Sequence, residues 1–233
     1  MLLLATPASA ADTATVSILH AVPGTPVDVY ANGQRLIEDF QPGTLTDPMQ
    51  LPAGSYDLAL YPADAPDASG APLLSAKGVA VPAGANATVV AHLTADGKPA
   101  LTPFVNDTSA IPAGQARVTV RHTAAAPAVD VRAAGAVVVP GLENPKEATL
   151  TVPAGTVSAD VVLAGTSTVA LGPADLALAE GTTNIVYAWG SQEAGFKLAV
   201  QTISGAHSAP SGVPGGSAGL VDDSSLPMPL AAV

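Results

Sequence analysis

Two histidines in the sequence each stand eight residues before an aspartate, His20 before Asp28 and His122 before Asp130. They form the repeated polar pattern of the chain and are its first candidate binding residues. An imidazole held by a carboxylate can be oriented for proton transfer or for metal binding. The same pair can instead bond buried backbone groups and fix a corner of a fold. The sequence favours the structural interpretation, with the functional one as the alternative.

Tyr187 and Trp189 alternate with apolar residues and stand close to Phe196. If they were exposed together, these rings would form a contact surface for a carbohydrate or a protein. Aromatic side chains more often anchor a core, because each buries a large apolar area. We therefore expect core anchoring and keep Trp189 as a candidate binding residue.

Other chemistry has little support in the sequence. Aromatic residues make up only 3% of the chain, which leaves few walls for a substrate pocket. The absence of cysteine excludes thiolate chemistry and cysteine-based metal sites. The acidic stretch 64–70 has carboxylates that calcium accepts, but it is sparser than a calcium-binding loop and is expected to be a solvated loop. We predict no enzyme activity, no cofactor and no metal site, and a hydrolase using His20 or His122 is the least favoured function.

The charge of the chain excludes some partners. The net charge is −11 with only 8 Lys and Arg residues, so the basic surface that binds phosphate backbones is missing. Nucleic acid is therefore not an expected partner. An acidic protein is also repelled by anionic lipid surfaces.

The N-terminus indicates export. A short apolar run ends in Ala8-Ser9-Ala10, a small-x-small pattern of the kind that signal peptidase cleaves. We predict a signal peptide over residues 1–10 and a secreted or cell-surface location. The apolar C-terminal end is far shorter than the roughly 20 residues of a membrane helix, so no transmembrane helix is expected.

An internal repeat organises the elements that carry these residues. His20, Asp28 and Gly33 recur without a gap as His122, Asp130 and Gly135. A period near 100 residues is typical of a duplicated domain, since solenoid repeats are about 20–50 residues long. We predict domains over 12–110 and 115–203, placed end to end with limited bending, and a disordered tail over 204–233, where Gly, Ser, Pro and Ala dominate its first part.

The local pattern within each copy is that of β-strands. Apolar residues alternate with polar ones, and Asn32-Gly33 is a strong two-residue hairpin signal. Pro-Ala-Gly turns, as at 52–54 and 153–155, punctuate the chain. About seven short strands per copy follow. The predicted fold is all-β, with two tandem immunoglobulin-like β-sandwich domains.

The motifs of the first copy resemble a known family. The run from His20 to Gly33 contains a His-Ala turn, a Pro-Val-Asp-Val-Tyr strand and an Asn-Gly hairpin, and a Leu-Pro-Ala-Gly-Ser-Tyr turn follows at 51–56. This pattern resembles the bacterial family named domain of unknown function 4397. The second copy departs from it at Arg132 and Val157, where the family has tyrosine. The resemblance implies an exported β-sandwich of bacterial surface or secreted proteins, often in tandem, and implies no known activity.

These observations predict an exported cell-envelope or secreted protein with a structural or adhesion-type role. Its partner would be a cell-surface protein or polysaccharide. The alternative is a module that binds carbohydrate or cell-wall polymer, which would need an exposed aromatic patch.

Overall fold

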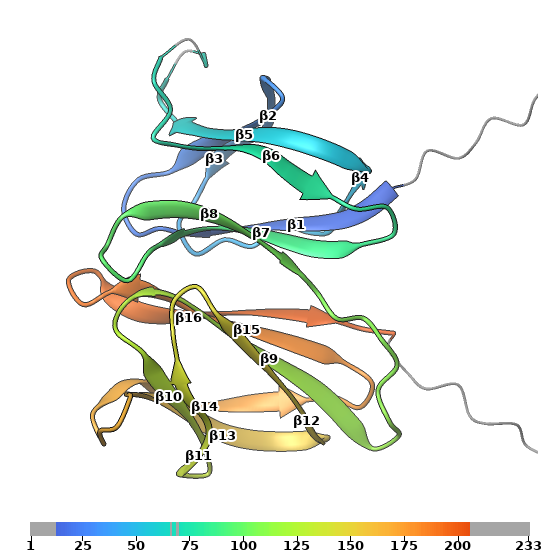
Figure 1. The fold of residues 1–233 in the computed structure, drawn as a ribbon, viewed down its shortest axis with the longest axis vertical. Coiled ribbons are helices and arrows are strands. Elements are labelled where there is room, and N and C mark those ends of the chain that lie inside the picture. The colour runs from blue at the N-terminus through green and yellow to red at the C-terminus, as the bar shows by residue number, and fades with distance from the viewer. Residues whose placement is uncertain (1–12, 66, 69, 206–233) are drawn as a thin grey trace, which may run out of the picture.

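A computed structural model describes residues 13–65, 67–68 and 70–205 of the chain (Figure 1). All regular elements in these ranges are β-strands. The predicted signal peptide lies outside the described residues, as do the predicted tail from residue 206 onward and two positions of the acidic stretch 64–70. No helix in the described ranges has the length and apolarity to cross a membrane.

The first sandwich is built from the strands before residue 106. They are β1 (Thr13–Ala21), β2 (Val27–Ala31), β3 (Gln34–Phe40), β4 (Met49–Pro52), β5 (Gly54–Pro62), β6 (Leu74–Val81), β7 (Asn86–Leu93) and β8 (Pro99–Val105). One sheet has the order β4-β1-β7-β8 and the other β3-β2-β5-β6. Within the first sheet, β1 pairs with β7 in parallel.

The second sandwich repeats this arrangement. Its strands are β9 (Gln115–Ala125), β10 (Val129–Ala133), β11 (Ala136–Leu142), β12 (Glu147–Pro153), β13 (Gly155–Leu163), β14 (Val169–Leu178), β15 (Thr183–Ser191) and β16 (Gly195–Ile203). The sheets have the orders β12-β9-β15-β16 and β11-β10-β13-β14. The all-β fold with two sandwiches is therefore confirmed.

Each sandwich has eight strands where the sequence predicted about seven. The difference lies at the Pro-Ala-Gly turns. β4 and β5 follow each other with only Ala53 between them, yet they belong to different sheets. A stretch that looks like a simple turn in the sequence is thus the point where the chain crosses from one sheet to the other.

The predicted alternation places apolar side chains inside each sandwich. In the first, Val16, Ile18, Val27 and Val29 point between the sheets and are buried. In the second, Val118, Val120, Val129 and Val131 do the same. Burying each such side chain stabilises the fold by about 1.5–3 kcal/mol, so small aliphatic residues suffice for both cores.

The two sandwiches also share a buried layer. Figure 1 shows four sheets stacked along the long axis, with β4-β1-β7-β8 facing β12-β9-β15-β16. The buried residues that meet there are Leu19, Ala21, Val90, Phe104, Ile185, Tyr187 and Trp189. The sandwiches therefore meet through sheet faces and not end to end as the short connecting segment had suggested. We call this layer the junction.

The segment between the sandwiches is held against the second one. Arg117 on β9 donates to the carbonyl oxygens of Asp107 and Ser109 at 3.1 and 3.0 Å and forms an ion pair with the Asp107 carboxylate. Ile111 is buried. These contacts leave little freedom for bending at this segment.

Candidate functional site

The two repeated histidines hold equivalent turns. His20 lies near the end of β1, and its Nε2 donates to the Thr25 carbonyl at 3.3 Å while its Nδ1 accepts from the Val22 amide at 3.4 Å. His122 bonds the Pro127 carbonyl at 2.9 Å and the Ala124 amide at 3.4 Å in the same way. Both ring nitrogens are therefore used within the turn that leads to the next strand.

Burial keeps these rings neutral. Loss of solvent lowers the pKa of His20 and of His122 below the usual 6.5, although the bond to a backbone carbonyl partly opposes this effect. A neutral ring with one donated and one accepted hydrogen bond has no free nitrogen. Proton transfer or metal binding by either histidine would require its turn to open.

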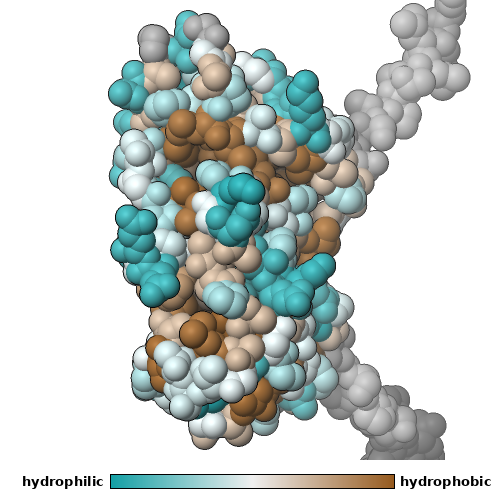
Figure 2. Space-filling model, turned by 60° about the vertical axis from the view of Figure 1, so that its left-hand side comes forward, coloured by the Kyte–Doolittle hydropathy of each residue, from teal (hydrophilic) through white to brown (hydrophobic). Residues whose placement is uncertain are grey.

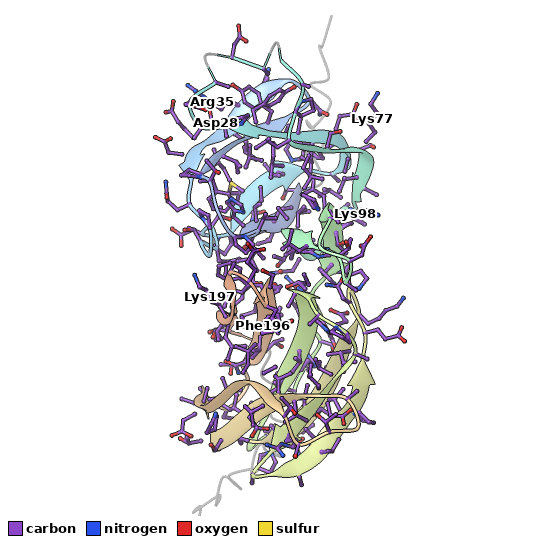
Figure 3. All side chains as sticks on the ribbon, turned by 90° about the vertical axis from the view of Figure 1, so that its left-hand side faces the viewer. Asp28, Arg35, Lys77, Lys98, Phe196 and Lys197 are labelled. Atoms are coloured by element: carbon purple, nitrogen blue, oxygen red, sulfur yellow. The ribbon has the colours of Figure 1, made fainter. Side chains whose placement is uncertain are left out.

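The aspartates have partners of their own. Asp28 Oδ1 accepts from the Asp39 amide at 3.0 Å, and its Oδ2 accepts from Arg35 at 3.2 Å (Figure 3). Asp130 accepts from the amides of Gly141 and Gly165 at 2.7 and 3.0 Å. The histidine of each pair thus fixes one turn and the aspartate another, and the imidazole and carboxylate do not bond each other in the described structure.

Trp189 lies in the junction and is only 3% exposed. Its ring packs against Gly43 of the first sandwich, where an added Cβ would come within 2.9 Å of it. Lys197 lies 5.2 Å from the ring centroid and covers its outer side. Within the described part of the chain the indole nitrogen has no hydrogen-bond partner. Trp189 therefore anchors the two sandwiches to each other.

A buried polar network lies at the junction, and little in the sequence pointed to it. Arg121, on β9, has a side chain only 1% exposed and binds Glu147 at 2.7 Å and the Tyr187 hydroxyl at 2.8 Å. Its guanidinium lies 4.4 Å from the ring centroid of Phe104 in the first sandwich. Tyr187 in turn donates to Gln201 at 2.7 Å. An arginine inside an apolar strand was the only signal, because the partners of Arg121 come from three other strands.

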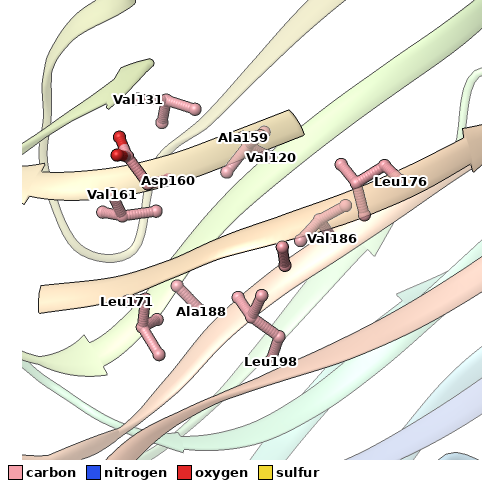
Figure 4. A pocket seen from close by; sticks show the side chains of 11 residues that line it. Val120, Val131, Ala159, Asp160, Val161, Leu171, Leu176, Val186, Ala188 and Leu198 are labelled. Carbon is pink, nitrogen blue, oxygen red and sulfur yellow. The ribbon is translucent and has the colours of Figure 1, made fainter. Parts of the chain in front are cut away.

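The cavities inside and between the sandwiches offer little for chemistry. The apolar cavity between the sheets of the second sandwich has a volume of about 30 Å³ (Figure 4), which is the space of one water molecule. A groove of about 340 Å³ opens at the edge of the junction, between the loop around Thr46 and the end of β16. Another of about 190 Å³ lies beside His20 and the exposed Leu73.

The outer face of the first sandwich carries a further hollow, of about 260 Å³, lined by Tyr30 and Tyr61. The two rings lie 5.2 Å apart at an interplanar angle of 76°. Neither tyrosine was a candidate in the sequence, although Tyr30 is part of the motif strand. Figure 2 shows that apolar side chains reach the surface of both sandwiches between polar ones.

Metal-binding residues do not gather in the described structure. Within residues 13–65, 67–68 and 70–205, no three His, Asp or Glu side chains are grouped as a metal ion would require.

Comparisons with known proteins give one informative match. No curated protein matches the chain. Among solved structures it is similar to a "putative cell adhesion protein" of Bacteroides uniformis ATCC 8492, with 12% identity and a TM-score of 0.21, over 84% of this chain and 99% of that one. A TM-score this low supports no inference about fold or function. The model of the family described as Domain of unknown function (DUF4397) matches residues 14–132, more than half of the chain, and the protein therefore belongs to this family.

Proposed function

We propose that the protein is exported to the cell envelope or secreted, and that it has a structural or adhesion-type role without chemistry of its own. The observation that carries this proposal is the junction. Trp189, Tyr187 and Phe104 bury their rings between two sheet faces, so the sandwiches form one stiff body. A stiff body built from stacked sheets is suited to holding a binding surface at a distance from its point of attachment.

The hydrogen bonds of the repeated histidines and aspartates support the non-catalytic part of the proposal. His20 and His122 use both ring nitrogens inside their own turns. Asp28 and Asp130 bond backbone amides of neighbouring elements. An active site needs a nucleophile or base that is within reach of a substrate, and these four residues do not provide one.

The position of Trp189 weighs against a carbohydrate-binding patch that contains this residue. A ring that stacks on a sugar must be exposed, whereas this one is covered by Gly43 and Lys197. A binding function would therefore use other aromatic residues.

Two measurements test the proposal. The full chain, expressed in a bacterial host, is expected in the envelope fraction or the medium, and a purely cytoplasmic location would contradict export. The purified chain is then incubated with isolated cell walls, extracellular polysaccharide and surface proteins. Retention on one of these fractions is expected, and retention on none would contradict an adhesion role.

A control separates binding from catalysis. The same fractions are assayed for released sugars, peptides and acyl groups after incubation with the chain. No release is expected. Turnover that disappears on His20→Gln or His122→Gln, with the fold retained, would show that the protein is an enzyme.

A further inference from the structure

The hollow on the outer face of the first sandwich is formed by three neighbouring strands. Tyr30 on β2 is paired with Ala59 on β5, and Ala59 is paired with Ser75 on β6. Tyr61 lies two residues after Ala59 and therefore on the same face of the sheet. Ala59 lines the hollow together with the two tyrosines. Tyr30 is only 8% exposed and packs against the Tyr61 ring, so the half-buried Tyr61 is the ring that the hollow presents to solvent.

The second sandwich has the same strands but carries other side chains at these positions. There Arg132 is paired with Asp160, which occupies the position of Ala59. The two side chains form a double hydrogen-bonded ion pair, with distances of 2.7 and 2.6 Å. Val162 stands where the first sandwich has Tyr61. The two sandwiches thus share the backbone pairing at this place and differ in the side chains that it carries.

The residues around the hollow combine apolar walls with polar groups. Asp57, Ser75 and Lys77 line it together with the tyrosines. One oxygen of Asp57 accepts from the Gly78 amide at 2.9 Å, and the second oxygen has no hydrogen-bond partner among the residues that the structure describes. Figure 3 shows Lys77 on the margin of the first sandwich opposite Arg35, as expected for residues of the two edge strands β6 and β3.

This combination points to a class of ligand. A sugar ring presents C–H groups that pack on aromatic rings and hydroxyl groups that bond carboxylate, hydroxyl and ammonium groups. The charges of Asp57 and Lys77 cancel, which favours a neutral ligand. The net charge of −11 further disfavours polyanions such as nucleic acids and phosphate-rich polymers.

We propose that the Tyr30–Tyr61 hollow binds a neutral hexopyranose unit of a glycan. This inference rests on the adhesion role proposed above and names the chemistry of its partner. The volume of about 260 Å³ is slightly below the roughly 300–1,000 Å³ of typical ligand pockets. The hollow therefore holds one sugar ring, and the rest of the glycan lies outside it.

The test is a titration of the full, isotope-labelled chain followed by nuclear magnetic resonance. The probes are the methyl glycosides of glucose, galactose, mannose and N-acetylglucosamine. At least one is expected to cause saturable shifts at the amides of Tyr30, Ala59, Tyr61 and Ser75. No saturable shift at these amides with any of the four probes would overturn the proposal.

Two variants identify the hollow as the site. Tyr61→Val removes one aromatic wall and copies the residue of the second sandwich; we expect about tenfold weaker binding, the equivalent of about 1.4 kcal/mol. Ala59→Leu places a larger side chain in the hollow and is expected to abolish binding. The matched control is Ala80→Leu, the same change at an exposed position on β6 outside the hollow. Undiminished binding by both variants would overturn the proposal.

The experiment also separates this inference from the function on which it rests. Retention of the full chain on an envelope fraction, with equal retention of Tyr61→Val and Ala59→Leu, would overturn the glycan site and leave the adhesion role intact. Saturable sugar binding without retention on any fraction would support the site and contradict the adhesion role.

Discussion

At the scale of single residues, the described histidines are structural. His20 and His122 close equivalent turns, while His92 donates from Nδ1 to the Leu93 carbonyl and accepts at Nε2 from the Thr102 hydroxyl. Loss of solvent lowers the pKa of all three below 6.5. His20 and His122 must stay neutral for both of their bonds to form, because each accepts from a backbone amide and a protonated ring has no acceptor.

This arrangement predicts a stability that depends on pH. In the unfolded chain the histidines have a pKa near 6.5, so below that pH the unfolded state binds more protons than the folded state. The stabilising contribution is therefore complete above about pH 6.5 and is lost as the pH falls toward the lower pKa values of the folded state. We expect the urea midpoint to fall between pH 7 and pH 5.

The check on this prediction is His122→Gln, which can still donate to Pro127 but does not titrate. Its urea midpoint is expected to change less between pH 7 and pH 5 than that of the parent chain. A midpoint that is independent of pH in the parent chain would show that the histidines are not held neutral.

At the scale of elements, each sandwich uses an aspartate to tie a hairpin to the sheet. Asp130 on β10 bonds the amide of Gly141 on β11 and that of Gly165 in the turn after β13. Those two backbone bonds lower the pKa of the Asp130 carboxyl, with the bond to Gly165 the larger cause. The register between β10 and β11 is irregular next to this residue, so the carboxylate bonds an amide that the regular ladder leaves out.

We predict that Asp130→Ala loosens both turns. Two amides lose their acceptor, and the free energy of unfolding is expected to drop. Hydrogen exchange should become faster at Gly141 and Gly165. Asp175→Ala, at an exposed position on β14, serves as the control and should leave these amides unchanged. Equal exchange in the two variants would contradict the proposed role of Asp130.

At the scale of the whole molecule, the junction joins the two sandwiches into one body. Residues from both contribute to the same apolar cluster, and the Arg121 network adds buried polar contacts to it. Removing one partner of a buried network leaves the charge or polar group of the other partner buried and unpaired, which costs free energy. The two sandwiches should therefore unfold together in a single transition.

The contact between Gly43 and Trp189 offers a direct test of the junction. Gly43→Ala places a Cβ within 2.9 Å of the indole, so the ring or the loop must shift. Gly33→Ala is the matched control, because both glycines have a positive φ and nothing lies within 4 Å of the Gly33 position. We expect Gly43→Ala to lose about 1–3 kcal/mol more stability than the control. The measurement is urea unfolding followed by the fluorescence of the single tryptophan, and equal losses would contradict tight packing at the junction.

The sequence by itself determined the strand architecture. Alternation of apolar and polar residues places Val16 and Ile18 on one face of β1, and Val27 and Val29 on one face of β2. This period of two is a local property of each strand and does not depend on how the strands pack. The hairpin at Asn32-Gly33 likewise depends on the positive φ that these two residues accept, and the structure shows it. Family membership was visible for the same reason, because the motif is a run of local turns and strands.

Only the tertiary structure decided which groups meet. The spacing of His20 and Asp28 allowed a pair, but each side chain bonds the backbone of a different turn. Trp189 lies on a strand whose outer face would meet solvent in a lone sandwich, and it is buried because a second sheet covers it. Tyr30 and Tyr61 come from separate strands, and they line one hollow because strand pairing brings them together on the same face of the sheet. Such contacts depend on pairing and stacking between segments that are distant in the sequence. The local alternation of apolar and polar residues carries no information about them.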